Sequence, residues 1–220
     1  MDIVRVYNAG IPGDTTAELL QRFDRDVAVH QPDVVCLLIG SNDMLYPGHM
    51  LELDEFRSNL ENLLDRISDL DSGVILMTAP RFITSLLLEN YPDTAAHPQS
   101  PEKRLEQLNC TIREVALLRG IAVVDLYKLI DPVDESPESM ILNWANSRRR
   151  DGMHLTAAGN EAAARAAAGV CRRRFPEAGC IVCLGDSLTY GVYMPGKGSA
   201  RADAQTYPGI LCKLLSGEAG

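Results

Sequence analysis

Apolar and polar residues follow two different periods along this chain, and each period predicts a different kind of element. Short, nearly continuous apolar runs predict strands. The clearest run is 33–39, which has the composition of a parallel strand buried on both faces. The other predicted strands are 3–7, 73–78, 121–124 and 181–184.

Longer segments carry apolar residues three and four positions apart, which places those residues on one face of a helix. In the segment 54–68 this face consists of Phe56, Leu60, Leu63, Leu64 and Ile67. The other predicted helices are 15–29, 102–119, 157–173 and 204–215. Asp14 or Thr15 can cap the first of these helices, and Thr156 can cap the one that starts at 157.

Because predicted strands alternate with predicted helices, the chain is expected to form a parallel sheet with helices on both faces, a three-layer α/β/α fold. Residues 1–220 show no repeat and no linker, which predicts a single domain. The segment 79–101 is long, irregular and rich in proline. Two interpretations of it stay open: its apolar stretch 83–88 lines an acyl pocket, or the segment forms a small extra helix packed on the body.

Composition and charge narrow the class of protein. Hydrophobic residues make up 46% and charged residues 23%, which is ordinary for a globular domain. The formal net charge of −9 disfavours nucleic acid and anionic lipid as partners. No apolar run approaches the roughly 18 residues of a membrane span, and the first residues lack the pattern of a signal peptide. These features predict a cytoplasmic protein without a membrane partner.

Two local clusters are each open to a functional and a structural interpretation. The basic run 148–150 is either a solvated loop beside Asp151 or an attraction point for an anionic substrate group. Cys180 and Cys183 form a C-x-x-C pattern, but residues three apart on a strand point to opposite faces. We therefore predict buried free thiols at these two positions and neither a redox nor a metal site.

Four short motifs follow apolar runs or precede a helix, where loops can carry functional side chains. The most informative is Gly185-Asp186-Ser187-Leu188, which comes directly after the run 181–184. The other three are Asn8-Ala9-Gly10, Gly40-Ser41-Asn42-Asp43 and Asp151-Gly152-Met153-His154. A serine, a histidine and an aspartate in such places are the side chains that nucleophilic catalysis needs.

Together the four motifs resemble the SGNH (GDSL) hydrolase family, in which the serine motif normally comes first. Here that motif comes last, so the chain resembles a circularly permuted member over nearly its whole length. The resemblance implies a five-stranded parallel, flavodoxin-like sheet. It also predicts that the last strand in sequence lies between the first two, giving the order 1-5-2-3-4. A connection from residue 220 to residue 1 would restore an ordinary helix-to-strand link.

The resemblance also implies roles for five residues. Ser187 is expected to be the nucleophile, His154 its base and Asp151 the acid that orients the histidine. The oxyanion hole is expected to consist of the Ser187 amide, the Gly10 amide and the Asn42 side chain. Two further acids, Asp186 and Asp43, are interpreted as structural residues that bond to backbone groups of their turns.

The function implied is that of a serine esterase that hydrolyses short-chain, acetyl-type carboxylic esters through an acyl-enzyme, with acetylated carbohydrates among its substrates. No metal or cofactor is needed, and the expected partner is a small-molecule ester; homo-oligomer formation is left open. Two alternatives remain. One is a thioesterase or lysophospholipase of the same family, and the other is a non-catalytic binding module on the same fold.

Overall fold

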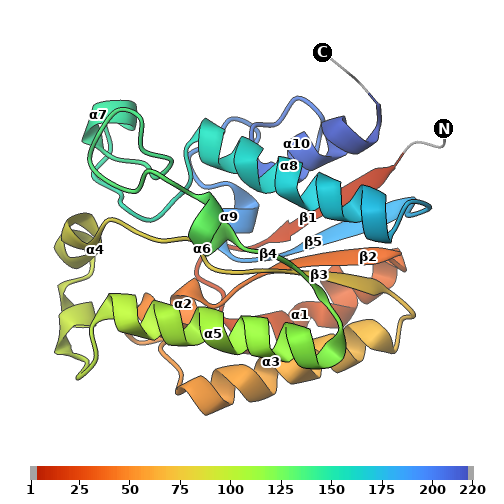
Figure 1. The fold of residues 1–220 in the computed structure, drawn as a ribbon, viewed down its shortest axis with the longest axis horizontal. Coiled ribbons are helices and arrows are strands. Elements are labelled where there is room, and N and C mark those ends of the chain that lie inside the picture. The colour runs from red at the N-terminus through yellow and green to blue at the C-terminus, as the bar shows by residue number, and fades with distance from the viewer. Residues whose placement is uncertain (1–3, 218–220) are drawn as a thin grey trace.

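Five parallel strands form one sheet in the order β1-β5-β2-β3-β4 (Figure 1). The computed structural model describes residues 4–217 of the chain. The predicted strand start at Ile3 and the two chain ends lie outside the described residues. The strands are β1 Arg5–Gly10, β2 Val34–Leu38, β3 Gly73–Met77, β4 Ala122–Val124 and β5 Cys180–Gly185.

The predicted strand order is confirmed. β5 is last in sequence but lies between β1 and β2, where Ile181 pairs with Val6 on one side and with Val34 on the other. All strand pairs are parallel, so every strand ends at the same edge of the sheet. That shared edge is where parallel sheets gather their functional loops.

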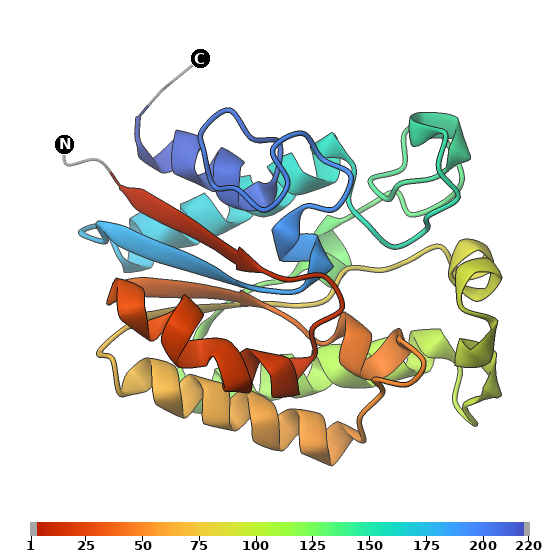
Figure 2. The ribbon, with the colours of Figure 1, turned by 180° about the vertical axis from the view of Figure 1, so that it is seen from behind.

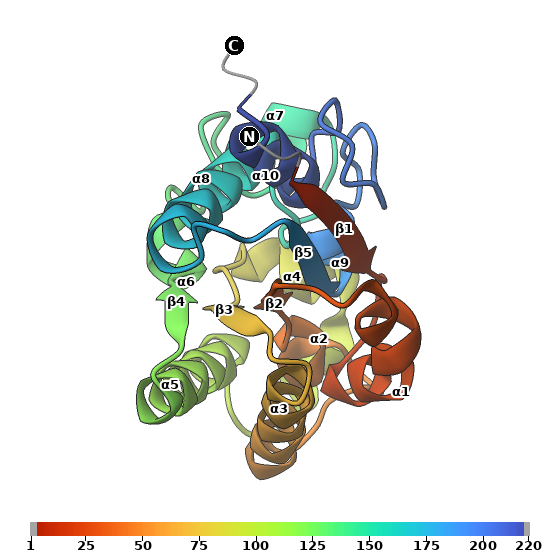
Figure 3. The ribbon, with the colours of Figure 1, turned by 90° about the vertical axis from the view of Figure 1, so that its right-hand side faces the viewer.

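Helices cover both faces of the sheet, which gives the predicted three layers (Figure 3). One face carries α1 Thr16–Asp26, α3 Leu53–Ser68 and α5 Pro101–Arg119, and the other carries α8 Ala157–Arg174 and α10 Tyr207–Leu215. The shorter elements are α2 Ser41–Leu45, α4 Thr84–Asn90, α6 Leu126–Leu129, α7 Trp144–Ser147, α9 Ser187–Tyr190 and the 3-10 helices Ala28–His30 and Pro92–Ala96.

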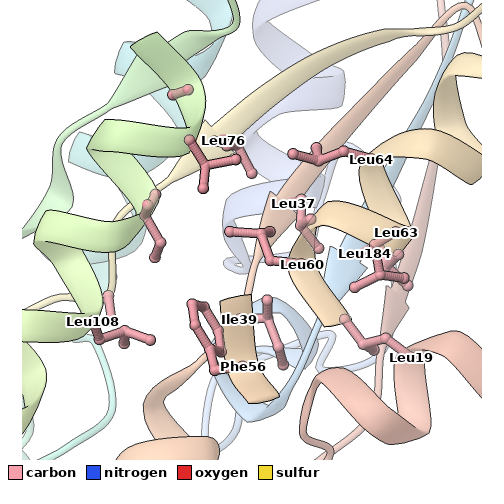
Figure 4. Packing of buried hydrophobic residues seen from close by; sticks show 14 of the residues in the cluster. Leu19, Leu37, Ile39, Phe56, Leu60, Leu63, Leu64, Leu76, Leu108 and Leu184 are labelled. Carbon is pink, nitrogen blue, oxygen red and sulfur yellow. The ribbon is translucent and has the colours of Figure 1, made fainter. Parts of the chain in front are cut away.

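The central strand β2 contributes side chains to two separate hydrophobic cores. Val35 and Leu37 point to the core under α1, α3 and α5, whereas Val34 and Cys36 point to the core under α8 and α10. This alternation follows from the two-residue period of a strand, and it explains why the sequence run is apolar without interruption. Figure 4 shows the first core, in which side chains of α3 meet the sheet.

The apolar face predicted for α3 is fully used in that core. Leu60 and Leu63 are 1% and 0% exposed, and Phe56 is 0% exposed. Burying one such side chain contributes about 1.5–3 kcal/mol relative to leaving it in water. The face of α3 therefore anchors the layer beneath the loops that follow β1 and β2.

Local side-chain bonds set the ends of the helices. Thr15 caps α1 in a capping box with Glu18, and the Thr156 hydroxyl accepts from the Gly159 N–H at 3.2 Å at the start of α8. Thr156 was predicted as a cap, and Thr15 was one of two residues predicted for the start of α1. Satisfying these otherwise unpaired N–H groups contributes about 1 kcal/mol at each helix.

The segment 79–101 contains a helix, as one of its two interpretations predicted. Within α4, Leu86 and Leu87 are each 0% exposed and pack into the body of the protein. The predicted thiols are confirmed as well, because Cys180 and Cys183 are buried and free. Within residues 4–217 no helix is both long enough and apolar enough to cross a bilayer.

Candidate active site

The loops that carry the predicted site leave three neighbouring strands at the same level. Gly10 of β1 pairs with Gly185 of β5, which in turn pairs with Leu38 of β2. The segments that follow, 11–14, 186–187 and 40–43, therefore begin side by side at one edge of the sheet. Figure 2 shows the loop after β1 and the turn after β5 on that side of the molecule.

Ser187 is the first residue of α9, immediately beyond the end of β5. Asp186 caps this short helix by accepting the Leu188 N–H at 2.9 Å, which is the structural role predicted for it. The Asp186 side chain is buried, and this burial raises the pKa of its carboxyl to about 7. The turn therefore fixes the backbone of Ser187, a residue that remains partly exposed.

Asp151 and His154 form a tightly bonded pair within one loop. The Asp151 Oδ2 lies 2.7 Å from the His154 Nδ1, and Oδ1 accepts from the backbone N–H groups of Met153 at 2.8 Å and His154 at 2.6 Å. Burial works to raise the pKa of Asp151, but the hydrogen bonds and charge of His154 together with the backbone donors leave that pKa below its ordinary value. The carboxylate stays ionised. It binds the imidazole through Nδ1, so Nε2 is the ring nitrogen that is left to contact other groups.

The loop itself is held by backbone bonds to the segment before α7. The Gly152 N–H donates to the Leu142 carbonyl at 2.8 Å, and the Leu142 N–H donates to the His154 carbonyl at 2.8 Å. Gly152 has a φ of +81°, a conformation that side chains rarely adopt. This glycine allows Asp151 to turn back onto His154.

Ser187, His154 and Asn42 line one cavity of about 290 Å³. The remaining lining is largely apolar and comes from Pro12, Gly13, Leu45, Tyr46, Tyr91, Met153 and Val192. Within residues 4–217 no hydrogen bond directly joins Ser187 to His154. Such contacts are often long in a free enzyme and shorten once substrate is bound.

Asn42 reaches this cavity from α2, the helix that follows β2. Its Nδ2 donates to the Asp14 carbonyl at 2.8 Å and lies 3.5 Å from the Asp186 Oδ2. The side chain is buried, so the amide group has a fixed orientation. Asn42 therefore presents the amide end of its side chain at the wall it shares with Ser187.

Asp43, the next residue, has a structural role that differs in detail from the prediction. It was expected to bond within its own turn, but its Oδ1 accepts from the N–H of Thr16 at 3.0 Å and from the Thr16 hydroxyl at 2.6 Å. Burial raises the pKa of Asp43 to about 6. The carboxyl therefore links α2 to the start of α1.

Gly10, predicted as an oxyanion donor, lies outside the lining of the cavity that contains Ser187. Its N–H donates to the Asn8 Oδ1 at 3.0 Å, and the residue lines a separate groove along β1 that does not contain Ser187. A Cβ at this position would lie 2.2 Å from the Tyr190 nitrogen, so the glycine serves close packing against α9. The glycine that lines the cavity is Gly13, whose φ is +89°.

A buried arginine that the sequence did not single out supports the loop of Gly13. Arg22 donates through Nε to the Asp14 Oδ2 at 2.6 Å, and through its two other nitrogens to the carbonyls of Ala9 and Gly185, both at 2.9 Å. The available signal was its position on the apolar face of the helix predicted at 15–29, between Leu19 and Phe23. A charged residue on such a face needs buried partners.

The apolar lining of the cavity was also missed. Tyr46, Tyr91 and Val192 lie in short loops or beside short helices, where hydrophobic periodicity gives no signal. Tyr91 is the one residue of the segment 79–101 that lines the cavity. Pro80 and Phe82 line a narrow extension of about 20 Å³. The apolar stretch 83–88 lines neither space, so its interpretation as an acyl pocket was wrong.

Comparison with known proteins decides the family. A model of the GDSL-like lipase/acylhydrolase family matches residues 2–162, about three quarters of the chain. The chain belongs to this family. As a GDSL (SGNH) family member, with relatives that are themselves esterases, it is a hydrolase of carboxylic esters.

Two curated relatives of the GDSL protein are esterases. It is 28% identical to an acetylxylan esterase of Geobacillus stearothermophilus over 172 residues, which span 74% of this chain and 70% of the relative. It is 31% identical to an arylesterase of Vibrio mimicus over 104 residues, which span 44% of this chain and 50% of the relative.

Solved structures of family members share the fold. A catalytic mutant of an acetylxylan esterase from Geobacillus stearothermophilus aligns with a TM-score of 0.51 at 26% identity, covering 70% of this chain and 66% of that one. A GDSL-like lipase from Bacteroides thetaiotaomicron aligns with a TM-score of 0.52 at 23% identity, covering 68% and 67%. The five-stranded parallel sheet between helical layers is thus the fold of this family.

Proposed function

We propose that this GDSL hydrolase is a serine acetylesterase whose catalytic residues are Ser187, His154 and Asp151. The observation that carries the proposal is the shared cavity. Ser187 and His154 line the same space of about 290 Å³, and Asp151 holds the far nitrogen of the imidazole at 2.7 Å.

In the proposed reaction the Ser187 hydroxyl attacks the carbonyl carbon of the ester while His154 Nε2 accepts its proton. Asp151 keeps the proton of the imidazole on Nδ1 and stabilises the imidazolium that forms. Its lowered pKa supports this role, because the carboxylate remains charged at neutral pH. The bond from Oγ to the carbonyl carbon produces a tetrahedral intermediate with a negative oxygen.

Three donors are assigned to that oxygen in this proposal. They are the N–H of Ser187, the N–H of Gly13, which takes the role predicted for Gly10, and the Asn42 side-chain amide. Within residues 4–217 neither backbone N–H has an acceptor. Two or three fixed donors of this kind typically stabilise the intermediate by about 3–4 kcal/mol each.

The second half of the reaction reverses the proton flow. His154 gives its proton to the departing alcohol oxygen, which leaves an acetyl group on Ser187. Water then attacks this acyl-enzyme as His154 takes one of its protons, and the collapse of the second intermediate releases acetate and restores the serine hydroxyl. No metal ion or cofactor takes part in these steps.

The cavity supports a short acyl group. Its volume of about 290 Å³ is at the small end for a ligand site, and Leu45, Tyr46 and Met153 line it with apolar surface. A long acyl chain would need a continuous apolar channel larger than this cavity. The small volume therefore disfavours the lysophospholipase alternative. The names of the two curated relatives, an acetylxylan esterase and an arylesterase, agree with acetyl esters as substrates.

We also propose that the chain is a circular permutation of the family fold. The family match at 2–162 includes the motifs of Asn42 and His154, whereas Ser187 follows it in sequence. β5 nevertheless lies between β1 and β2, and Val4 packs into the same core as Leu215. A gene rearranged to begin near residue 178, with a short linker from 217 to 4, should yield a folded and active enzyme.

The decisive test of the function is hydrolysis of p-nitrophenyl esters of increasing acyl length, with a Ser187→Ala variant as the blank. We expect the highest kcat/KM for acetate, a steep fall beyond about four carbons, and only background rates for Ser187→Ala. If the wild type and Ser187→Ala bound the esters equally well and neither hydrolysed them, the result would instead favour the non-catalytic module. A preference for long acyl chains or for thioesters would favour the thioesterase or lysophospholipase alternative.

A further inference from the structure

A second, more polar hollow adjoins the catalytic cavity. It has a volume of about 330 Å³ and shares His154, Met153 and Tyr91 with the first space. Its other lining residues are Asn90, Arg148, Arg149, Arg150, Asp151 and Tyr193. Three consecutive arginines thus lie beside the histidine of an acidic protein with a net charge of −9.

The three arginines are not equivalent. Arg150 is neutralised by Glu89, whose two carboxylate oxygens lie 2.7 and 2.5 Å from its Nε and Nη2. The Arg148 guanidinium lies 5.7 Å from the ring centre of Trp144, and the Arg149 guanidinium lies 4.2 Å from that of Tyr193. In the part of the chain that the structure describes, neither of these two forms an ion pair.

Arg149 is also tied to the catalytic histidine through an aromatic ring. Tyr193, beneath its guanidinium, meets the His154 ring edge-on at 5.7 Å between centroids. A guanidinium that stacks by its face keeps its N–H edges free for a planar anion. The stack therefore presents an oriented, uncompensated positive charge close to the reacting groups.

The reaction determines which part of the substrate faces this charge. In the proposed mechanism His154 protonates the departing alcohol, so the alcohol lies on the histidine side of the ester. The polar hollow extends from that side, whereas Leu45 and Tyr46 line the apolar cavity that would hold the acyl group. An anion bound at Arg149 would accordingly belong to the alcohol part.

We propose that Arg149, with Arg148 beside it, binds a negatively charged group on the alcohol part of the substrate. The substrate class is then acetyl esters of anionic alcohols, such as saccharides that carry a uronic acid carboxylate or a sulfate. This proposal rests on the acetylesterase function proposed above, and it makes the arginine run a specificity determinant.

A matched pair of substrates tests this charge preference. The anionic substrate is 4-acetoxybenzoate and the neutral one is its methyl ester; the 3-acetoxy isomers cover a second direction. The variant is Arg149→Gln, and the matched control is Arg173→Gln, an exposed arginine of α8 outside both cavities. For each protein we take the ratio of kcat/KM for the anionic ester to kcat/KM for the neutral ester. Comparing this ratio between variants cancels the different intrinsic reactivity of the two esters.

We expect Arg149→Gln to lower kcat/KM for the anionic ester by roughly three- to tenfold, as the loss of one partly exposed charge contact should. The neutral ester should change by less than about twofold, and Arg173→Gln should change neither. The anion preference of the wild type should shrink between 50 and 500 mM salt, because salt screens exposed charges. Arg149→Lys should keep part of the preference.

An unchanged anionic-to-neutral ratio in Arg149→Gln, for both isomers, would overturn the proposal. The two hypotheses fail differently, because loss of the acetylesterase function would abolish turnover of the neutral ester too. Replacing the carboxylate by a sulfonate, as in 4-acetoxybenzenesulfonate, separates the two anion sources. If Arg149→Gln lowers kcat/KM equally for the sulfonate and the carboxylate ester, the site binds anions in general. If it lowers kcat/KM for the carboxylate ester alone, the site is one for carboxylates.

Discussion

Arg22 and Asp14 form a buried ion pair, with 2.6 Å between Nε and Oδ2, directly beneath the loop that carries Gly13. The same guanidinium donates to the carbonyls of Ala9 and Gly185, at the ends of β1 and β5. One side chain therefore joins the two strand ends from which the Gly13 loop and the Ser187 turn begin. We expect the positions of the proposed oxyanion donors, Gly13 and Ser187, to depend on this contact.

The first prediction concerns Arg22→Met. Removing the guanidinium leaves the buried Asp14 carboxylate without its partner, and breaking such a pair typically costs about 3–5 kcal/mol. The variant should show a clearly lower melting temperature, and its kcat per folded molecule should fall because the Gly13 loop loses its support. Urea unfolding and kcat are measured on the same samples.

The control for that variant is Arg25→Met. Arg25 contacts Asp26, as Arg22 does, but its side chain is 70% exposed, so its replacement should leave both quantities unchanged. If Arg22→Met behaved like Arg25→Met, the buried guanidinium would have no role in holding the strand ends.

The second prediction distinguishes Gly10, at the end of β1, from Gly13 in the loop that follows. Gly10→Ala would place a Cβ 2.2 Å from the Tyr190 nitrogen, so the protein should be strongly destabilised. Gly13→Ala meets no atom within 4 Å but must adopt a φ of +89°, which costs about 1–2 kcal/mol. It should fold, with kcat lowered by roughly tenfold because the strained backbone shifts its N–H.

Melting temperature and kcat together distinguish these outcomes. A stable Gly10→Ala protein with a specific loss of kcat would restore Gly10 as the oxyanion donor. A Gly13→Ala protein with full activity would remove Gly13 from that role.

The third prediction concerns Asn42→Ala. Loss of this proposed oxyanion donor should lower kcat by about two to three orders of magnitude, while KM changes much less. Because Asn42 Nδ2 also donates to the Asp14 carbonyl at 2.8 Å, stability should drop by about 1–2 kcal/mol. A rise in KM at constant kcat would make Asn42 a substrate-binding residue.

The fourth prediction concerns pH and Asp186. Its pKa is about 7 in the folded protein because of burial, against about 3.9 in an unfolded chain. Between these values the folded state holds a proton that the unfolded state has lost. The contribution of Asp186 to stability therefore falls as pH rises from about 4 to 7, by a few kcal/mol at most.

Asp186→Asn should remove this pH dependence while retaining an acceptor for the Leu188 N–H. The difference in unfolding free energy, variant minus wild type, should increase between pH 4 and pH 7 and then level off. Asp203→Asn, at a surface carboxylate paired with Arg201, is the control. A difference that stays flat with pH would mean that Asp186 is ionised in the folded protein throughout.

The fifth prediction separates Asp151 from His154. In the proposed mechanism the proton passes through the imidazole, so His154→Ala should abolish nearly all turnover, whereas Asp151→Asn should retain more. The double variant Ser187→Ala with His154→Ala should be no worse than either single change, since the residues act as a unit. If Asp151 only supported its loop, Asp151→Asn would lower the melting temperature and leave kcat near the wild-type value.

The helical layers followed from hydrophobic periodicity, whereas the strand order followed from the resemblance of the four motifs to the SGNH family. The central strand shows this best, since 33–39 is apolar on both faces and β2 contributes to both cores. The Thr156 cap was likewise predicted from its position alone, whereas for the first helix the sequence left Asp14 and Thr15 as alternatives.

The features that sequence did not reveal depend on contacts between distant segments. Gly10 and Gly13 both follow the first apolar run, and only the packing of Gly10 against Tyr190 shows which of them faces the cavity. The role of Arg22 depends on the Gly185 carbonyl, 163 positions further along the chain. Such pairings have no local period, so no pattern along the sequence reports them.

The central claim, that Ser187 is the nucleophile, is tested most directly by covalent labelling with a phosphonofluoridate, followed by peptide mass spectrometry. We expect one label per chain, on the peptide that contains Ser187, appearing in step with the loss of acetylesterase activity. Ser187→Ala should take up no label, and His154→Ala should take it up far more slowly. A label on another residue, or Ser187→Ala that is still labelled and active, would contradict the claim.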